Sequence, residues 1–282
     1  MMIRADQTAS DVGAVFASDH NQFLRMRSQI IDALLNAPVI HTGRWQQLDI
    51  SQSSAHGTHE LLNVTVWMDM QETAWQSQES IRPDLPWAEA HFRERVGGAP
   101  VNPGREWANW PYHGVDPDLH RRLDQKFDHN YMERLWAKEL RYEDELHNRP
   151  ASPTAYPFTG YRFAVGDLAD VVEQLRRDPT TRQAYLPMWF PEDTGARAGQ
   201  RVPCSLGWHF IIREGRLHVS YWLRSCEIYR HFTNDVYMAV RLGQWVREQC
   251  EVGMVYEMGQ LTVNIVSLHA FVGDVPAIRR MQ

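Results

Sequence analysis

The feature that most constrains the fold is a pair of strand-like segments separated by a short turn. Residues 205–212, SLGWHFII, and residues 216–224, RLHVSYWLR, are joined by Arg213, Glu214 and Gly215. Both segments are rich in β-branched and aromatic residues, and a short connection containing glycine between such segments is typical of a β-hairpin. We therefore expect a sheet in which these two strands are antiparallel neighbours.

The rest of the chain supplies further helices and strands around this hairpin. Apolar spacing and end signals predict helices over 21–38, 84–98, 119–146, 167–177 and 235–250, and strands over 59–70, 183–190 and 261–272. The elements alternate without a regular βαβ rhythm, and no repeat or low-complexity linker interrupts them. We expect an α/β (α+β) fold in a single domain over residues 1–282, with a mixed β-sheet flanked by helices.

Composition excludes several classes of function. The net charge of −6 comes from acidic and basic residues that are mixed along the chain, which argues against a nucleic-acid-binding surface. Three cysteines without a C-x-x-C pair indicate a reduced, intracellular protein. No signal-like apolar segment and no run of 18 apolar residues occurs, so we expect a cytoplasmic protein without a membrane partner. The histidines show no H-E-x-x-H pattern, and we expect no metal site.

Cys204 lies directly after Pro203 and directly before the hairpin. A cysteine attacks a substrate as a thiolate, which nearby cations favour, and Arg182 and Arg224 lie on segments that can reach the same end of a sheet. On its own, Cys204 fits a buried structural thiol as well as a nucleophile.

Three other positions also allow a functional and a structural interpretation. Arg224 and Ser225 offer paired guanidinium donors and a hydroxyl to a phosphate, but they also suit an exposed strand end. Asp235 begins a predicted helix, where aspartate is a common N-cap. Glu89, in WAEAHF, is a proton shuttle if buried and an ordinary surface residue if not.

Taken together, these segments resemble the thymidylate synthase superfamily, which includes the deoxycytidylate and cytidylate hydroxymethylases. The order is Pro-Cys, a hairpin ending in Arg-Ser 20 residues after Cys204, and an Asn or Asp at a helix start 11 residues after Arg224. Residues 178–189, DPTTRQAYLPMW, resemble the family's arginine segment, and SLHAF at 267–271 resembles its sugar-binding segment. The resemblance covers residues 85–272, with residues 98–118 as a possible insertion loop.

The resemblance implies roles for individual residues. Cys204 is similar to the nucleophile that attacks C6 of a pyrimidine, Glu89 to the carboxylate that relays protons, and Tyr131 to a tyrosine beside the ring. Further residues are similar to the family's phosphate ligands: Arg224, Ser225, Arg44 and Arg182. Of these, Arg182 is similar to the ligand that reaches the site of a second subunit. His269 is similar to the sugar contact, and Glu227 to the folate contact.

Asp235 distinguishes members of the superfamily. Thymidylate synthases have asparagine there, whose amide matches the N3–H and O4 of uracil. A protonated carboxyl matches the N3 and N4 amino group of cytosine, and a carboxylate matches them once N3 is protonated. Asp235 therefore favours a cytosine nucleotide. Three departures from the pattern are Gln183 at the second paired arginine, Ser205 at a usual histidine, and Phe271 at the sugar-binding tyrosine, which leaves ribose and deoxyribose both open.

The resemblance therefore implies a homodimeric, folate-dependent one-carbon transferase. We expect a hydroxymethyltransferase that converts dCMP, or CMP, to its 5-hydroxymethyl form with 5,10-methylenetetrahydrofolate through a covalent Cys204–C6 adduct. Two alternatives stay open: a dCMP or dUMP methylase of the thymidylate synthase type, and a catalytically inactive nucleotide-binding relative.

Overall fold

The expected hairpin is present in the structure. The computed structural model describes residues 15–18, 23–45, 48–112, 126–136, 166–194, 201–251 and 253–282. Strands β7 (Ser205–Arg213) and β8 (Arg216–Leu223) pair antiparallel across the two-residue turn of Glu214 and Gly215. Both turn residues have positive φ, 52° and 73°, as the turns that match the twist of a hairpin require.

At its open end the hairpin brings two distant residues face to face. The pairing shifts by one residue between Ser205 and Gly207, which is a β-bulge. Just beyond the strands, the Arg224 amide donates to the Cys204 carbonyl at 2.9 Å. The hairpin therefore places Cys204 opposite Arg224.

The hairpin belongs to a mixed sheet, as expected. The strand order is β1 (Val15–Ser18), β5 (Thr58–Asp69), β10 (Glu257–Phe271), β8, β7 and β6 (Tyr185–Pro187). β10 runs parallel to β8 and antiparallel to β5, while β1 runs parallel to β5. The short strands β2 (Val39–Ile40) and β9 (Cys226–Glu227) pair with β5 and β10. β3 (Arg44–Trp45) and β4 (Leu48–Asp49) form a separate pair.

Helices and short helical turns complete the described structure. The α-helices are α1 (Phe23–Asn36), α2 (Ala74–Ile81), α3 (Trp87–Arg95), α4 (Met132–Leu135), α6 (Leu168–Arg177), α7 (Pro191–Thr194), α8 (Thr233–Cys250) and α9 (Val275–Arg279). The short turns are η1 (Ser54–His56), η2 (Arg105–Asn109), η5 (Val272–Asp274) and the π-helical η4 (Ile228–Phe232).

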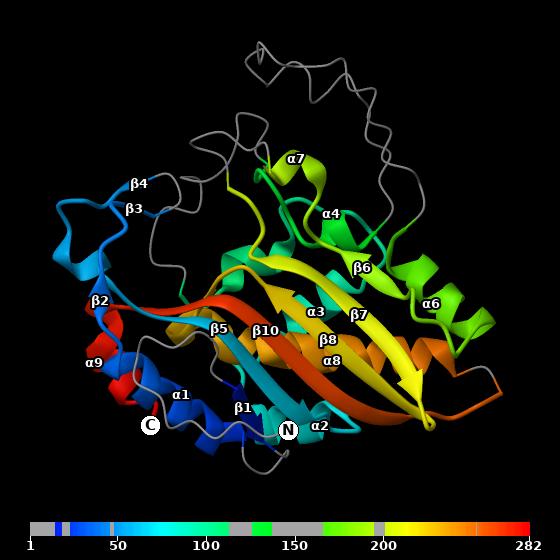
Figure 1. Cartoon of the computed structure of the whole chain (residues 1–282). Coiled ribbons are helices and arrows are strands. Elements are labelled where there is room, and N and C mark those ends of the chain that lie inside the picture. Colours follow the sequence, from blue (N-terminus) through cyan, green and yellow to red (C-terminus); the bar gives the residue numbers. More distant parts are fainter. Residues whose placement is uncertain are drawn as a thin grey trace.

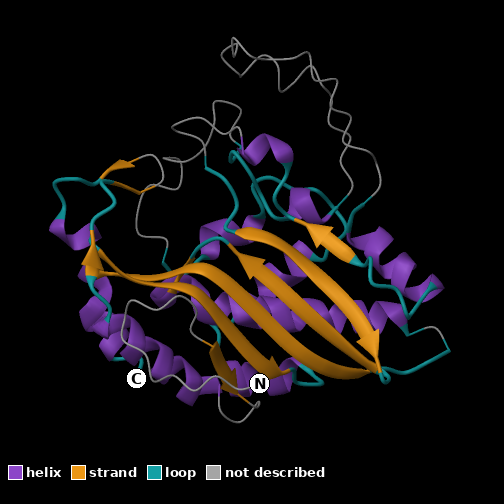
Figure 2. Cartoon of the chain, in the orientation of Figure 1, coloured by secondary structure: helices purple, strands orange, loops and turns teal. Residues whose placement is uncertain are grey.

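The core lies between the sheet and the long helix α8. α8 crosses behind β8 and β10, with α2 and α3 on the same side (Figure 1). Alternate residues of β8, such as Val219 and Tyr221, are buried against this layer, and the residues between them are only partly buried. The alternation follows from the two-residue period of a strand. Figure 2 shows the resulting arrangement, with helices gathered behind and beside the twisted strands.

One predicted helix is wrong over much of the part that the structure describes. Of the expected helix over 119–146, the structure describes 126–136, and within that range only Met132–Leu135 is helical. The Asn102 side chain accepts from the Phe127 amide and donates to the Phe127 carbonyl, both at 3.0 Å. These bonds take the place of the helical hydrogen bonds that Phe127 would make.

The start of α8 also differs from the prediction. Its first turn continues directly from η4, so the helical backbone begins at Ile228 rather than at Asp235. The capping side chain is that of Glu227, which accepts from the amides of Tyr229 and Arg230 at 2.7 Å each. The N-cap interpretation of Asp235 is therefore wrong.

Candidate active site

Cys204 and Arg224 form the centre of the candidate site. The Arg224 guanidinium donates to the carbonyls of Pro203 at 2.8 Å and Val202 at 3.1 Å, and its Nη2 lies 3.8 Å from the Cys204 Sγ. The guanidinium is thus fixed by the backbone that precedes the cysteine. A cation in this place stabilises a thiolate.

The electrostatic environment of Cys204 is mixed. Burial raises the pKa of the thiol, and the charges of Arg224 and Arg201 oppose this effect while Asp235 adds to it. The net shift is upward, so the thiol is protonated at neutral pH in the free protein. The neighbouring arginines reduce the cost of forming the thiolate without removing it.

Asp235 lies in the first turn of α8 and faces the same cluster. Its Oδ2 accepts from the Cys226 thiol at 3.6 Å. Burial raises the pKa of Asp235 to about 6, against the lowering effects of the Arg95 charge and the Cys226 hydrogen bond. The carboxyl can therefore change its protonation state near neutral pH.

Tyr131 closes the cluster on another side. Its hydroxyl accepts from the Ser205 amide at 3.4 Å, one residue after Cys204. The Arg95 guanidinium lies over its ring, 4.5 Å from the centroid. Burial raises the pKa of Tyr131, and the charges of Cys204 and Asp235 raise it further. The hydroxyl is therefore neutral, and it accepts a hydrogen bond from the backbone one residue after Cys204.

Ser225, which follows Arg224 in the chain, lies close to His269. The Ser225 hydroxyl is 3.5 Å from His269 Nδ1, which joins the end of the hairpin to β10. Burial lowers the pKa of His269, and the charge of Glu60 opposes this effect. The two side chains offer neutral hydrogen-bonding groups next to Arg224.

Glu89 does not join this cluster. Its carboxylate accepts from the Tyr237 hydroxyl at 2.7 Å and from the Arg241 guanidinium at 3.0 and 3.1 Å. Burial would raise the pKa of Glu89, but hydrogen bonds from Arg241 and Tyr237 outweigh it, and the pKa is lowered. The residue is held ionised against α8.

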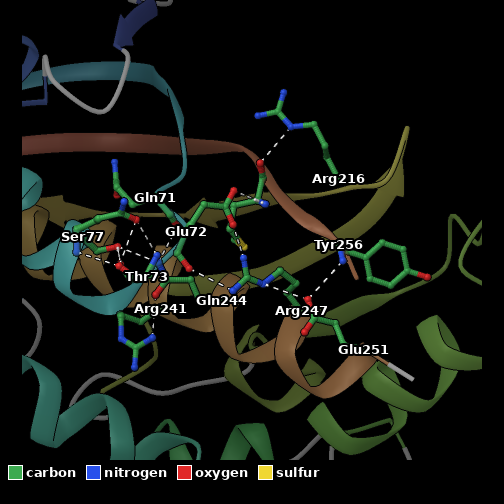
Figure 3. Close-up of polar contacts among 12 residues, drawn as sticks. Gln71, Glu72, Thr73, Ser77, Arg216, Arg241, Gln244, Arg247, Glu251 and Tyr256 are labelled. Atoms are coloured by element: carbon green, nitrogen blue, oxygen red, sulfur yellow. Dashed lines mark hydrogen bonds and ion pairs between the residues drawn. The ribbon is translucent and has the colours of Figure 1, made fainter. Parts of the chain in front are cut away.

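The Glu89 pair is the end of a larger polar network. Arg241 donates to Gln244 at 2.8 Å, and the buried Gln244 donates in turn to the Gln71 carbonyl and the Ser77 hydroxyl. Figure 3 shows Arg241 and Gln244 close together, below Gln71 and Ser77 in this view. These contacts tie α8 to α2 and α3, and Glu89 is the residue of α3 that takes part in them.

The remaining predicted residues have varied positions. Both carboxylate oxygens of Glu227 cap the η4 backbone, and burial raises its pKa to about 7 against the lowering effect of these amides. The Arg182 and Gln183 side chains are exposed, and the Arg182 carbonyl accepts from His209. Arg44 lies in β3, but its side chain is outside the described part of the structure.

Two arginines at the site were missed by the sequence analysis. Arg201 and Arg95 act electrostatically on Cys204 and Asp235 respectively. Arg201 precedes Cys204 by three residues, a proximity that could have drawn attention to it. No sequence signal identifies Arg95, because its position depends on which face of α3 packs against the site.

Comparisons with known proteins agree with this architecture. The sequence profile of the family described as thymidylate synthase matches residues 59–281. A protein of Methanothermobacter thermautotrophicus named "Putative thymidylate synthase" is 35% identical over 111 residues, which are 39% of this chain and 46% of that protein. A protein of Methanosarcina acetivorans with the same name is 29% identical over 111 residues, 39% of this chain and 48% of that protein. The chain thus spans about half the length of the curated relatives it matches.

A solved structure extends the likeness to the whole fold. The thermostable thymidylate synthase A from Bacillus subtilis superposes with a TM-score of 0.61, covering 94% of this chain and 84% of that one at 17% identity. In the described parts of the chain, no helix is both long and apolar enough to cross a membrane.

Proposed function

Because the chain belongs to the thymidylate synthase family, we propose that it transfers a one-carbon unit to C5 of a cytosine nucleotide. In this proposal the substrate is dCMP or CMP, the donor is 5,10-methylenetetrahydrofolate, and the product carries a 5-hydroxymethyl group. The observation that carries the proposal is the carboxyl of Asp235 in the same cluster as Cys204.

Asp235 selects the base by hydrogen-bond complementarity. Uracil presents a donor at N3 and an acceptor at O4, and a carboxylate cannot donate to the latter. Cytosine that is protonated at N3 presents two donors, N3–H and the N4 amino group, which the two oxygens of a carboxylate accept. The pKa of about 6 lets Asp235 share a proton with N3 as the reaction proceeds.

Cys204 provides covalent catalysis. Its thiolate forms a bond to C6, and the electron pair of the C5–C6 double bond passes to C5, which attacks the one-carbon unit. C5 then loses its proton and the bond between the one-carbon unit and its folate nitrogen breaks, so that tetrahydrofolate leaves and an exocyclic methylene remains. Water adds to this methylene and gives up a proton, and the Cys204–C6 bond breaks, which restores the thiolate. Splitting the substitution into these steps lowers the individual barriers.

Arg224 and its neighbours bind the rest of the nucleotide in this proposal. The Arg224 guanidinium and the Ser225 hydroxyl contact the phosphate, and His269 contacts the sugar. Arg182 and Arg44 add to the phosphate site, with Arg182 reaching the site of a second copy in a homodimer. The exposure of the Arg182 side chain supports this arrangement, because an exposed arginine is available to a partner.

The folate fits an aromatic surface beside the cluster. When bound, 5,10-methylenetetrahydrofolate supplies the one-carbon unit. Its pteridine is a flat conjugated ring, and the exposed His231 ring stacks on Trp110 at 5.2 Å, with Trp110 stacked in turn on Trp107. Planar side chains of this kind suit a planar ligand. Glu227 lies just before η4, which carries His231.

Tritium release from C5 tests the proposed function. The protein is incubated with 5-tritiated dCMP, CMP or dUMP and methylenetetrahydrofolate, and the product is identified by mass. We expect release from a cytosine nucleotide and a product that contains the added hydroxymethyl group, and none with Cys204→Ser. A methylated product indicates a methylase, release from dUMP alone refutes the Asp235 argument, and no release from any nucleotide indicates an inactive relative.

A further inference from the structure

Cys226 comes two residues after Arg224 and contacts the side chain proposed to recognise the base. Its Sγ lies 3.6 Å from the Asp235 Oδ2, a separation that suits an S–H donor because sulfur is a large atom. The Cys226 side chain is buried, and its backbone is held in β9 by pairing with Leu268 of β10. The thiol is thus fixed inside the protein against Asp235, and the proposed function does not yet use it.

Cys226 is the donor in this contact. Burial raises the pKa of the thiol well above its ordinary value, and the charges of Asp235 and Glu227 raise it further. The S–H group is therefore intact at neutral pH. The Glu227 carbonyl is a second acceptor at 3.8 Å, farther from the sulfur than the Asp235 Oδ2. The shorter contact directs the thiol proton at the carboxyl.

The thiol gives the two carboxyl oxygens different roles. Oδ2 accepts from Cys226, which is the only hydrogen-bond partner of the Asp235 side chain in the part of the chain that the structure describes. Because a carbonyl oxygen is a better acceptor than a hydroxyl oxygen, the bond from sulfur favours a protonated carboxyl whose proton is on Oδ1. Oδ1 then has a proton to share with N3 of cytosine. Oδ2 has a second lone pair, which can accept from the N4 amino group.

The titratable and charged groups around Asp235 come from several elements. Electrostatic interactions link its carboxyl to Arg95 on α3, Tyr131 before α4, Cys204 before β7, Tyr221 on β8 and Cys226 on β9. The Arg95 charge and the Cys226 hydrogen bond lower the pKa of Asp235, but burial outweighs both and raises it to about 6. A thiol is a weak donor, so it orients the carboxyl while lowering its pKa less than a hydroxyl would.

We propose that Cys226 is a positioning residue for the proposed reaction: its thiol donates to Oδ2 of Asp235, which fixes the carboxyl and leaves Oδ1 to exchange a proton with N3 of a cytosine base. The inference rests on the proposed function, because that function assigns Asp235 to base recognition. Cys226 acts on the base only through Asp235.

The S–H stretching band in the Raman spectrum tests the contact without any substrate. The band of Cys226 is identified by its loss in Cys226→Ala. We expect it to move to lower frequency as pH rises through the Asp235 midpoint of about 6, because a carboxylate is a stronger acceptor than a neutral carboxyl. The band should not move in Asp235→Asn. A Cys226 band that stays constant through this pH range in the wild type overturns the inference.

Titration of Asp235 measures what the thiol does to the carboxyl. The protein is labelled with 13Cγ-aspartate, and the Asp235 resonance is identified by its loss in Asp235→Asn. Cys226→Ala removes a donor to the charged form, so the midpoint should rise by about half a pH unit or more. Cys226→Val fills the place of the sulfur without donating, which excludes a substitute water, and should give a similar rise. Cys226→Ser supplies a stronger donor and should lower the midpoint.

Cys250→Ala is the matched control for these variants. Cys250 is also a buried free thiol, but its Sγ lies 3.9 Å from the Val172 carbonyl, and it donates to no carboxylate among the described residues. Its replacement should leave the Asp235 midpoint unchanged. A midpoint that is equal in wild type, Cys226→Ala and Cys226→Val overturns the inference.

The pH profile of kcat/KM for dCMP and CMP connects the contact to the reaction. The proton shared by Oδ1 and N3 is lost as pH rises through the Asp235 midpoint, so activity should fall along this limb. The limb should move upward in Cys226→Ala and downward in Cys226→Ser, together with the midpoints. A limb that stays in place while the midpoint moves overturns the inference. A midpoint that moves in a protein that turns over no nucleotide supports the action of Cys226 on Asp235 and refutes the proposed function instead.

Discussion

Replacing Arg224 with methionine is expected to slow the reaction of Cys204 with a neutral disulfide reagent. The Arg224 Nη2 lies 3.8 Å from the Cys204 Sγ, and burial has already raised the pKa of this thiol. Removing the nearest cation removes an interaction that favours the thiolate. Since the thiolate is the reactive species, the rate at neutral pH should fall.

The separation sets the size of the effect. Two unit charges 3.8 Å apart interact by about 1 kcal/mol in a water-like medium and about 4 kcal/mol at an effective dielectric of about 20. A thiolate with a higher pKa is also a stronger nucleophile, which offsets about half of the loss on a logarithmic scale. The net decrease in rate should therefore lie between about twofold and about fiftyfold.

The assay follows 4,4′-dithiodipyridine between pH 6 and pH 10, with the modified cysteine located by peptide mass mapping. Mapping is needed because Cys226 and Cys250 are also free thiols, although burial raises the pKa of both. Arg224→Lys keeps the charge without the paired contacts to Pro203 and Val202 and should lie between wild type and Arg224→Met.

Arg213→Met provides the matched control, because Arg213 lies at the far end of the same hairpin. It should leave the reaction of Cys204 unchanged. Identical pH profiles for wild type and Arg224→Met would refute the reasoning, since the guanidinium would then have no electrostatic effect on the sulfur.

Three other predictions follow from buried carboxyl groups. Burial raises the folded-state pKa of Asp235 from 3.8 to about 6, so the wild type loses stability as pH rises from about 4 to about 6. In urea unfolding at pH 8, the free energy of unfolding of Asp235→Asn should therefore exceed that of the wild type by about 2–3 kcal/mol. At pH 4 the two free energies should differ little. Glu89→Gln should lower the free energy of unfolding by about 1–3 kcal/mol, because it leaves the Arg241 charge poorly paired. In this variant the disulfide reagent should still modify Cys204 at the wild-type rate. Asp235→Asn should also shift kcat/KM from cytosine toward uracil nucleotides, and an unchanged preference in the tritium assay would contradict the complementarity argument.

The sequence contained enough information for the sheet and for the centre of the candidate site. A glycine-containing turn between two strand-like segments identifies a hairpin, and a hairpin necessarily brings its two ends together. Cys204 and Arg224 lie at those ends, so their proximity follows from local pairing alone. The position of Asp235 near Cys204 could also be predicted, because a helix that follows the second strand returns along the same sheet.

The positions that depend on helix phase could not be predicted. Glu89 and Arg95 both lie on α3, but which of them contacts Arg241 and which lies over Tyr131 depends on how the helix is rotated against α8. The network around Arg241 and Gln244 fixes that rotation, and its members are distant in sequence. The π-helical turn could not be predicted either, because nothing in the sequence IYRHF distinguishes a π turn from an α turn. This turn extends the helical backbone toward the N-terminus, so that Glu227 and not Asp235 is the capping residue.

The pairing of Cys204 with Arg224 has a consequence for finding similar sites in other sequences. The interval of 20 residues between them measures the length of a hairpin: two strands, a two-residue turn and one bulge. Lengthening each strand by one residue would increase the interval by two and leave the cysteine opposite the arginine. An odd change would need one more bulge or one fewer. A search for this site should therefore accept a series of even-numbered intervals and treat the tip of the hairpin as a place where length is free to vary.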